Sequence, residues 1–124
     1  MQPYKIDTID RKILRELQRD GALRNDVLAE RVALTPAPTL RRVRALEEAG
    51  VISSYVALVD PLSVGLGLRV KVEVRLAAQT RDQIDAFSAA VSAMPEVVEC
   101  MILFGEWDFQ LIVVARDVED YQRF

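Results

Sequence analysis

The chain has 124 residues and 51% hydrophobic composition, enough to bury the core of one ordinary domain or two small ones, and no apolar run approaches the roughly eighteen residues of a membrane span. It contains no histidine and one cysteine, which excludes Ser-His and Cys-His nucleophiles, an intrachain disulfide and an ordinary zinc site. The net charge is −3, but residues 1–60 hold ten Lys/Arg and nine Asp/Glu while residues 61–124 hold six and ten, so the excess acid lies in the second half.

The first predicted element is an amphipathic helix that begins after Asp7 and ends before Gly21. Asp7 is a suitable N-cap, because its carboxylate can accept hydrogen bonds from the free amides of the first turn. No apolar segment of a secretory signal precedes it, so we expect a cytoplasmic protein. The apolar residues of the helix recur every three or four positions and form one stripe, which consists of Ile6, Ile9, Ile13, Leu14 and Leu17.

Two further helices are predicted between Leu23 and Gly50. Asn25 or Asp26 can cap the first of them. Thr35 is a favoured N-cap for the second, and Pro36 is tolerated at the first helical position because its missing N–H would be unpaired anyway. Gly50 supplies the left-handed residue that commonly ends a helix. The sequence therefore predicts two helices joined by a tight turn.

The second helix of this pair has one apolar side and one small, basic side. On a helical wheel the apolar side holds Pro36, Leu40, Val43 and Leu46, and the opposite side holds Ala37, Pro38, Arg41 and Ala45, with Arg42 and Arg44 at its flanks. Small residues let a helix approach base edges in the major groove, and guanidinium groups bind guanine or phosphate. Arginines can also form an ordinary solvated surface, but the capped two-helix frame favours a DNA-reading helix-turn-helix.

The pattern after Gly50 changes to an extended one. Residues 51–59 are predicted to form a strand, because they are rich in β-branched and aromatic side chains and are followed by Asp60-Pro61. The segment up to Gly67 has no clear periodicity. We assign residues 53–67 as a strand and linker.

The second half alternates strands and helices. Residues 68–76 alternate strictly between apolar and charged side chains, as in a strand with one buried face. A capping box of Thr80 and Gln83 begins a helix that Pro95 ends, with Ile84, Phe87, Val91 and Met94 on one face. Strands are predicted at 97–104 and 109–115. Asp117 then caps a last helix, with Val118 and Tyr121 inward.

This order of strand, helix, strand, strand, helix gives five of the six elements of a ferredoxin-like β-α-β-β-α-β sandwich. The closing strand is missing from the predicted order, so we expect an exposed sheet edge and apolar surface that needs a cover. Residues 1–60 carry a net charge of only +1, so a single copy of the chain should bind DNA weakly. Useful affinity therefore requires two copies on one duplex.

The turn between the last two strands is a candidate ligand site. It consists of Gly105, Glu106, Trp107 and Asp108. Gly105 lets a backbone approach closely, and Asp108 or nearby amides could orient the charged ends of an amino acid at a subunit boundary. The alternative is a plain hairpin turn in which Trp107 packs, and spacing alone favours that alternative.

Segments in both halves resemble the Lrp/AsnC family, the leucine-responsive and asparagine-regulator group also called feast/famine regulators. In the first half the resemblance is carried by residues 6–14, 28–32, 34–43 and 46–52. In the second half, residues 95–100 and 105–109 are similar to the effector domain of that family, the RAM domain. The family usually has Ser where Thr35 and Ala37 stand, so this chain keeps a hydroxyl at the first position and loses one at the second.

The resemblance implies an α+β protein with a winged helix-turn-helix DNA-binding domain at residues 1–52 and a RAM-type effector-binding and dimerisation domain at residues 68–124. We expect this second domain to lack its last strand and to be incomplete at its C-terminal end. The implied function is a sequence-specific transcription regulator controlled by a small effector such as an amino acid. It needs no metal, cofactor or catalytic residue.

The residues expected to contact DNA are Thr35, Pro36, Ala37, Pro38, Thr39, Arg41, Arg42 and Arg44, and those expected to bind the effector are Gly105, Glu106, Trp107 and Asp108. The expected partners are double-stranded DNA, an amino acid and a second copy in a homodimer, with tetramers or octamers as larger assemblies. Two alternatives stay open. The chain could be an architectural DNA-organising protein with little effector control, or a small-molecule binding module, which predicts no salt-dependent DNA binding.

Overall fold

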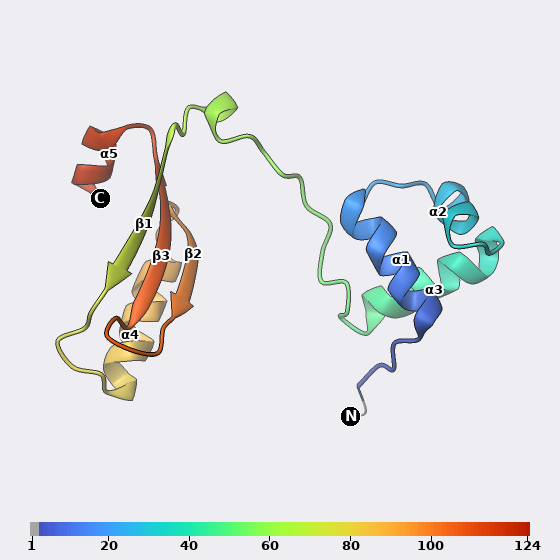
Figure 1. Ribbon diagram of the computed structural model, residues 1–124, viewed down its shortest axis with the longest axis horizontal. Coiled ribbons are helices and arrows are strands. Elements are labelled where there is room, and N and C mark those ends of the chain that lie inside the picture. The colour runs from blue at the N-terminus through green and yellow to red at the C-terminus, as the bar shows by residue number, and fades with distance from the viewer. Residues whose placement is uncertain (1–2) are drawn as a thin grey trace. The chain divides into compact units, whose positions relative to one another are not determined.

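The computed structural model describes residues 3–124 and divides the chain into two compact units, one ending at Leu58 and the other running from Val59 to Phe124 (Figure 1). The first unit contains three α-helices, and the second contains a three-stranded sheet with two α-helices. Among the described residues, no helix is both long enough and apolar enough to cross a bilayer.

The N-terminal unit begins with α1 (Thr8–Arg19), and its start confirms the predicted cap. The amide of Asp10 donates to Asp7 Oδ1 at 2.8 Å, and the amide of Asp7 donates to Asp10 Oδ2 at 3.2 Å. This reciprocal pair satisfies two of the amides that the first turn of a helix leaves free. The apolar stripe of α1 then packs against α2 (Asn25–Arg31) and α3 (Pro36–Glu48) around a buried cluster that consists of Ile13, Leu28, Val32 and Leu46.

The start of α2 differs from the prediction. The N-cap is Arg24, and it makes no side-chain cap hydrogen bond. Asn25 is already the first helical residue, and its amide group reaches instead across the turn, where Nδ2 donates to the carbonyl of Pro36 at 2.9 Å. Between the two helices Ala33 takes a left-handed backbone with φ of 57°. The turn is thus tightened by one left-handed residue and one amide bridge.

The helix α3 has the predicted ends. Thr35 occupies the N-cap and Pro36 the first helical position, although the Thr35 hydroxyl makes no cap hydrogen bond. At the other end Gly50 is left-handed with φ of 75°, and the amide of Ile52 donates to the carbonyl of Leu46 at 3.1 Å. These contacts satisfy carbonyls that the last turn of a helix leaves free.

The predicted strand at 51–59 is wrong, because this segment is irregular and forms no ladder. Strand-forming side chains express their preference only where a neighbouring strand supplies backbone partners. No described residue of the N-terminal unit forms a strand that could do so. Tyr55 instead packs beside Gly21, and the linker that follows contains one short 3₁₀ turn, Leu62–Val64.

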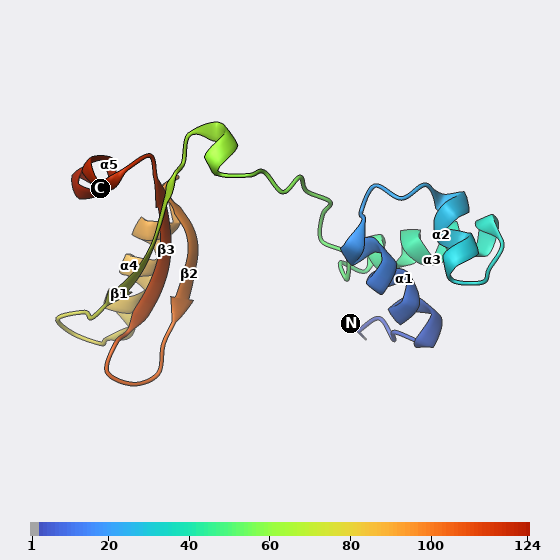
Figure 2. The ribbon, with the colours of Figure 1, turned by 45° about the horizontal axis from the view of Figure 1, so that its top comes forward.

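The C-terminal unit has the predicted order of elements: β1 (Leu68–Val74), α4 (Arg81–Ser92), β2 (Val97–Ile102), β3 (Phe109–Ala115) and α5 (Val118–Arg123). The strands are antiparallel in the order β1-β3-β2, and α4 lies against one face of the sheet (Figures 1 and 2). The first predicted strand extends two residues past the observed end of β1, and the second two residues past that of β2. Thr80 caps α4 by accepting from the amide of Gln83 at 3.3 Å.

The core of this unit lies between the sheet and α4. It centres on Val91, Leu111 and Val113, and the rings of Phe87 and Phe109 lie with their centroids 4.7 Å apart. Inward and outward residues of β1 alternate as predicted. Tyr121 packs against this core, but the prediction for Val118 is wrong, because that side chain is 59% exposed. Val118 is the first residue of a six-residue helix, and so short a helix buries only part of its first turn.

Candidate DNA-binding and effector sites

The outer surface of α3 exposes four of the predicted DNA-contacting residues to solvent. Pro36, Ala37, Arg41 and Arg44 are exposed, and Pro38 between them is half-buried. The predicted position of Pro36 on the apolar side is wrong, since the buried stripe of α3 begins only at Thr39. Within the part of the chain that the structure describes, neither Arg41 nor Arg44 forms an ion pair.

Thr39 was expected at the DNA surface, and the structure contradicts this. Its side chain is 0% exposed, and its hydroxyl donates to the carbonyl of Thr35 at 3.0 Å. A buried hydroxyl needs such a partner, and a carbonyl one turn earlier in the helix is the nearest one. Thr39 therefore belongs to the interior of the helix bundle. The hydroxyl of Thr35, by contrast, lies at an exposed N-cap without a cap hydrogen bond.

Arg42 was expected to contact DNA, and the structure gives it another partner. Its Nη1 donates to Asp7 Oδ2 at 2.6 Å and to Asp10 Oδ1 at 3.0 Å. Asp10 is almost fully buried, and its other oxygen accepts from the hydroxyl of Tyr4 at 3.2 Å. We call this set of Tyr4, Asp7, Asp10 and Arg42 the α1–α3 clamp. It fixes α3 against the start of α1.

The charges of the clamp shift the pKa values of its members. The backbone amide of Asp10 and then the Arg42 guanidinium lower the pKa of Asp7. Hydrogen bonds to Asp7 and Asp10 raise the pKa of Arg42. Desolvation and the hydrogen bond to Asp10 raise the pKa of Tyr4. Each shift favours the protonation state present at neutral pH, so the charges that hold the clamp are present at that pH.

Sequence reasoning missed the clamp, although the sequence contained a sign of it. Asp10 lies four residues after Ile6 and three before Ile13, so it stands on the apolar stripe of α1. A carboxylate in such a position must be paired when it is buried. Its partner lies 32 residues away on another helix and could not be identified from local spacing.

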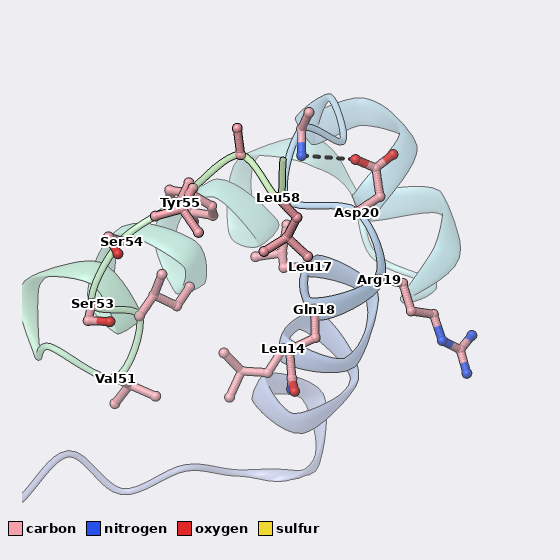
Figure 3. A pocket seen from close by; sticks show the side chains of 15 residues that line it. Leu14, Leu17, Gln18, Arg19, Asp20, Val51, Ser53, Ser54, Tyr55 and Leu58 are labelled. Carbon is pink, nitrogen blue, oxygen red and sulfur yellow. Dashed lines mark hydrogen bonds between the residues drawn. The ribbon is translucent and has the colours of Figure 1, made fainter. Parts of the chain in front are cut away.

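Two hollows lie on the N-terminal unit. The smaller, of about 360 Å³, is lined by Tyr4, Pro38, Arg41, Arg42 and Ala45, beside the outer surface of α3. The larger, of about 850 Å³, is an open groove between the C-terminal half of α1 and residues 51–58 (Figure 3). Leu14 and Leu17 project into it from α1, and Tyr55 and Leu58 from the irregular segment. None of its lining residues belongs to α3.

The predicted effector turn is held by Asp108. Its Oδ2 accepts from the amide of Leu76 at 2.7 Å and from Gln79 Nε2 at 3.3 Å, and its own amide donates to the carbonyl of Val74 at 2.9 Å. This carboxylate oxygen therefore ties the turn to the end of β1. Gly105 has φ of 129° and no atom within 4 Å of where a Cβ would stand.

The rest of the turn is open to solvent. Trp107 is 40% exposed, and Glu106 lies 3.7 Å from Arg75 in a weak surface pair. Among the described residues no group of His, Cys, Asp or Glu side chains is arranged to hold a metal ion. The chemistry available at this turn is thus that of backbone amides, an aromatic ring and carboxylates.

Comparison with known proteins gives a family match for each of the two units. The family model for winged helix-turn-helix DNA-binding matches residues 6–53, and the one for the Lrp/AsnC ligand binding domain matches residues 69–124. The leucine-responsive regulatory protein of Rhizobium meliloti is 45% identical over 120 residues, which cover 97% of this chain and 77% of that protein. The chain belongs to the Lrp/AsnC family.

Solved structures of Lrp/AsnC regulators agree with this assignment. An AsnC family transcriptional regulator from Agrobacterium tumefaciens has a TM-score of 0.91 and 42% identity, covering 96% of this chain and 78% of the other. A transcriptional regulator of Neisseria meningitidis in complex with L-Met also has a TM-score of 0.91 and 42% identity, covering 97% and 77%. The chain is thus a DNA-binding transcription regulator with a ligand-binding domain, and its curated relatives are regulators rather than enzymes.

Proposed function

We propose that this Lrp/AsnC regulator binds its operator by placing α3 in the major groove, with Arg41 and Arg44 as the arginines that contact DNA. The observation that carries this proposal is the division of labour among the three arginines of α3. Arg42 is bound to two carboxylates, whereas Arg41 and Arg44 are exposed and unpaired among the described residues. Unpaired guanidinium groups on an outer helix surface can bind guanine edges or phosphates without first breaking an ion pair.

Contacts to the DNA backbone would come from the start of the same helix. The exposed Thr35 hydroxyl is free to donate to a phosphate oxygen, since it makes no cap hydrogen bond. The α1–α3 clamp holds the angle of α3 and offers no free positive charge, because its one guanidinium is bound to two carboxylates, one of them almost fully buried. Nearly all of the salt dependence of binding should therefore come from Arg41, Arg44 and other free cations.

The working form in this proposal is a homodimer in the cytoplasm, from which tetramers or octamers can assemble. The first half of the chain carries a charge of only +1, so two copies on one duplex would supply the affinity that one lacks. Two α3 helices related by a twofold axis would read half-sites about one helical turn apart. The C-terminal unit would hold the dimer, as its exposed Val98 and Met101 offer apolar surface for a second copy.

The effector in this proposal is an amino acid bound near the turn at residues 105–108. Support comes from the match to the Lrp/AsnC ligand binding domain and from the Neisseria meningitidis neighbour in complex with L-Met. In this chain Asp108 would shape the site, because it already holds the turn to β1. Gly105 and Trp107 would contact the ligand, the first through its open backbone and the second through its partly exposed ring.

Binding of the full chain to fragmented genomic DNA across a salt series tests this proposal. We expect Arg41→Ala/Arg44→Ala to lower affinity at least tenfold and to reduce the slope of log affinity against log salt by about one for each phosphate that is no longer neutralised. Arg81→Ala is the matched control, since Arg81 is an exposed arginine of the C-terminal unit. Repeating the series with each amino acid, methionine first, identifies the effector. Equal binding by the double variant and the control would refute the role of α3.

A further inference from the structure

Apart from the Thr35 hydroxyl and the Ala37 amide, the polar groups at the start of α3 have partners within the protein. The carbonyl of Thr35 accepts from the amide of Thr39 at 3.4 Å and from the Thr39 hydroxyl at 3.0 Å, and the carbonyl of Pro36 accepts from Asn25 Nδ2 at 2.9 Å. The first three helical positions carry one amide N–H among them, that of Ala37, because the residues on either side are prolines. Little hydrogen-bonding capacity is left for base edges at this end.

What the start of α3 does present is apolar. Pro36 and Ala37 are exposed and Pro38 is half-buried, so ring methylenes and one methyl group form its outer surface. In the major groove the thymine C5-methyl is the one apolar group of the base edges, and small apolar side chains contact it. Hydrogen-bonding edges such as those of cytosine or adenine would lose water against this surface without gaining a partner.

The first arginine available after this apolar end is Arg41, one turn further along the helix. Four residues of helix advance about 6 Å, and base pairs are stacked about 3.4 Å apart. The base pairs that Ala37 and Arg41 can contact are therefore about two base pairs apart. Arg42 cannot fill the second role, since it is held in the clamp.

We propose that the surface of Pro36, Ala37 and Pro38 selects a thymine in each operator half-site by contacting the C5-methyl group of that thymine. Arg41 then reads a guanine that lies about two base pairs away. This proposal rests on the proposed function, the placement of α3 in the major groove. It goes further by naming the bases and the atoms that distinguish them. The specificity residues are Ala37 for the methyl and Arg41 for guanine N7 and O6.

The test begins with selection of bound duplexes from a random library by the full chain. Each thymine of the selected half-site is then replaced by deoxyuridine, which removes the methyl group and keeps base pairing. We expect one position at which this change weakens binding about fourfold per half-site, the value of one buried methyl-sized group. At the guanine two base pairs away, 7-deazaguanine should weaken binding by the wild type and have no effect on Arg41→Ala.

The protein side of the test is Ala37→Ser, which puts a hydroxyl where the methyl contact would be. For this variant we expect deoxyuridine and thymine to bind equally at the critical position. Ala49→Ser is the matched control, because Ala49 is also exposed but caps the other end of α3, and it should keep the fourfold preference. Comparing the two DNA bases with wild type and with Ala37→Ser forms a double-mutant cycle. It separates the methyl contact from any general effect of serine on stability.

The outcomes separate this proposal from the one it rests on. Selective binding that no deoxyuridine weakens, or a methyl preference that Ala37→Ser keeps, overturns the thymine proposal while leaving groove binding intact. Absence of any selected sequence, together with equal salt slopes for wild type and Arg41→Ala/Arg44→Ala, overturns both.

Discussion

The two units of this Lrp/AsnC regulator differ in how far each completes its own packing. The three helices of the N-terminal unit enclose a core around Ile13 and Leu46, and the clamp neutralises the buried Asp10. In the C-terminal unit the outer edges of β1 and β2 have no strand partner among the described residues, and Ile102 and Phe104 stay exposed. The first unit exposes the arginines of α3 that are unpaired among the described residues, and its exposed large apolar side chains lie in the irregular segment after α3, whereas the second exposes apolar side chains on and beside its sheet.

This difference fits the roles proposed above for the two units. DNA offers phosphates and base edges, so a DNA-binding unit needs free arginines on its outer surface. The proposed dimer would need an interface with a desolvated apolar centre, and the exposed apolar side chains of the C-terminal unit would supply it. Variants that alter one unit and spare the other can break or sharpen this comparison.

The largest expected effect is that of Phe109→Ala on the C-terminal unit. Phe109 is 0% exposed and packs on Phe87, so its truncation should cost about 3–5 kcal/mol of the free energy of unfolding of that unit. Phe104→Ala is the control, since Phe104 is fully exposed and its loss should cost less than about 0.5 kcal/mol. Fluorescence of Trp107, the single tryptophan, reports unfolding of this unit in urea.

In the same experiment, amide hydrogen exchange in α1–α3 should be unchanged by Phe109→Ala, because each unit has its own core. Loss of protection in these helices would show that the two units unfold together. A small effect of Phe109→Ala on the fluorescence midpoint would contradict the packing described above.

The next effect separates stability from DNA binding within α3. Arg42→Met leaves the buried Asp10 without its guanidinium and should cost about 2–3 kcal/mol of the free energy of unfolding of the N-terminal unit. Arg44→Met removes an exposed, unpaired guanidinium and should leave stability within about 0.5 kcal/mol. Its effect should appear in the affinity for DNA and in its salt slope. Hydrogen exchange and a salt titration on both variants measure the two quantities.

The reverse pattern would refute the proposal that Arg42 stabilises the fold while Arg44 contacts DNA. If Arg42→Met kept full stability and lost the salt slope, Arg42 would be a DNA contact, and the clamp would open on binding.

Much of the fold could be predicted because local rules set it. Asp7 begins α1, Thr35 and Gly50 bracket α3, and the strict alternation of residues 68–76 predicted β1, since capping and periodicity depend on neighbours in sequence. The misplaced cap of α2 shows where a local rule fails, because a contact outside that helix competes with the cap. There Asn25 had a better use, a hydrogen bond to a carbonyl eleven residues away.

The features of the candidate site that could not be predicted depend on distant contacts. Thr39 and Arg42 were expected at the DNA surface from the helix-turn-helix pattern and the family resemblance. The packing of α3 against α1 turns Thr39 inward and pairs Arg42. The predicted strand at 51–59 had suitable residues but no neighbouring strand. A wheel shows which residues share a side of a helix, but the width of the buried side depends on what packs there.

The smallest expected effect concerns backbone strain at Ala33. A left-handed alanine costs roughly 1–2 kcal/mol relative to right-handed backbone. Glycine avoids this cost, but its more flexible unfolded chain lowers the free energy of unfolding by about 0.4–1 kcal/mol. Ala33→Gly should therefore stabilise the N-terminal unit by up to about 1 kcal/mol, although most Ala→Gly changes destabilise. The matched change Ala89→Gly, at an exposed site inside α4, should destabilise the C-terminal unit by about the same amount. Hydrogen exchange resolves the two units, and destabilisation by both changes would mean that the turn between α2 and α3 holds Ala33 without strain.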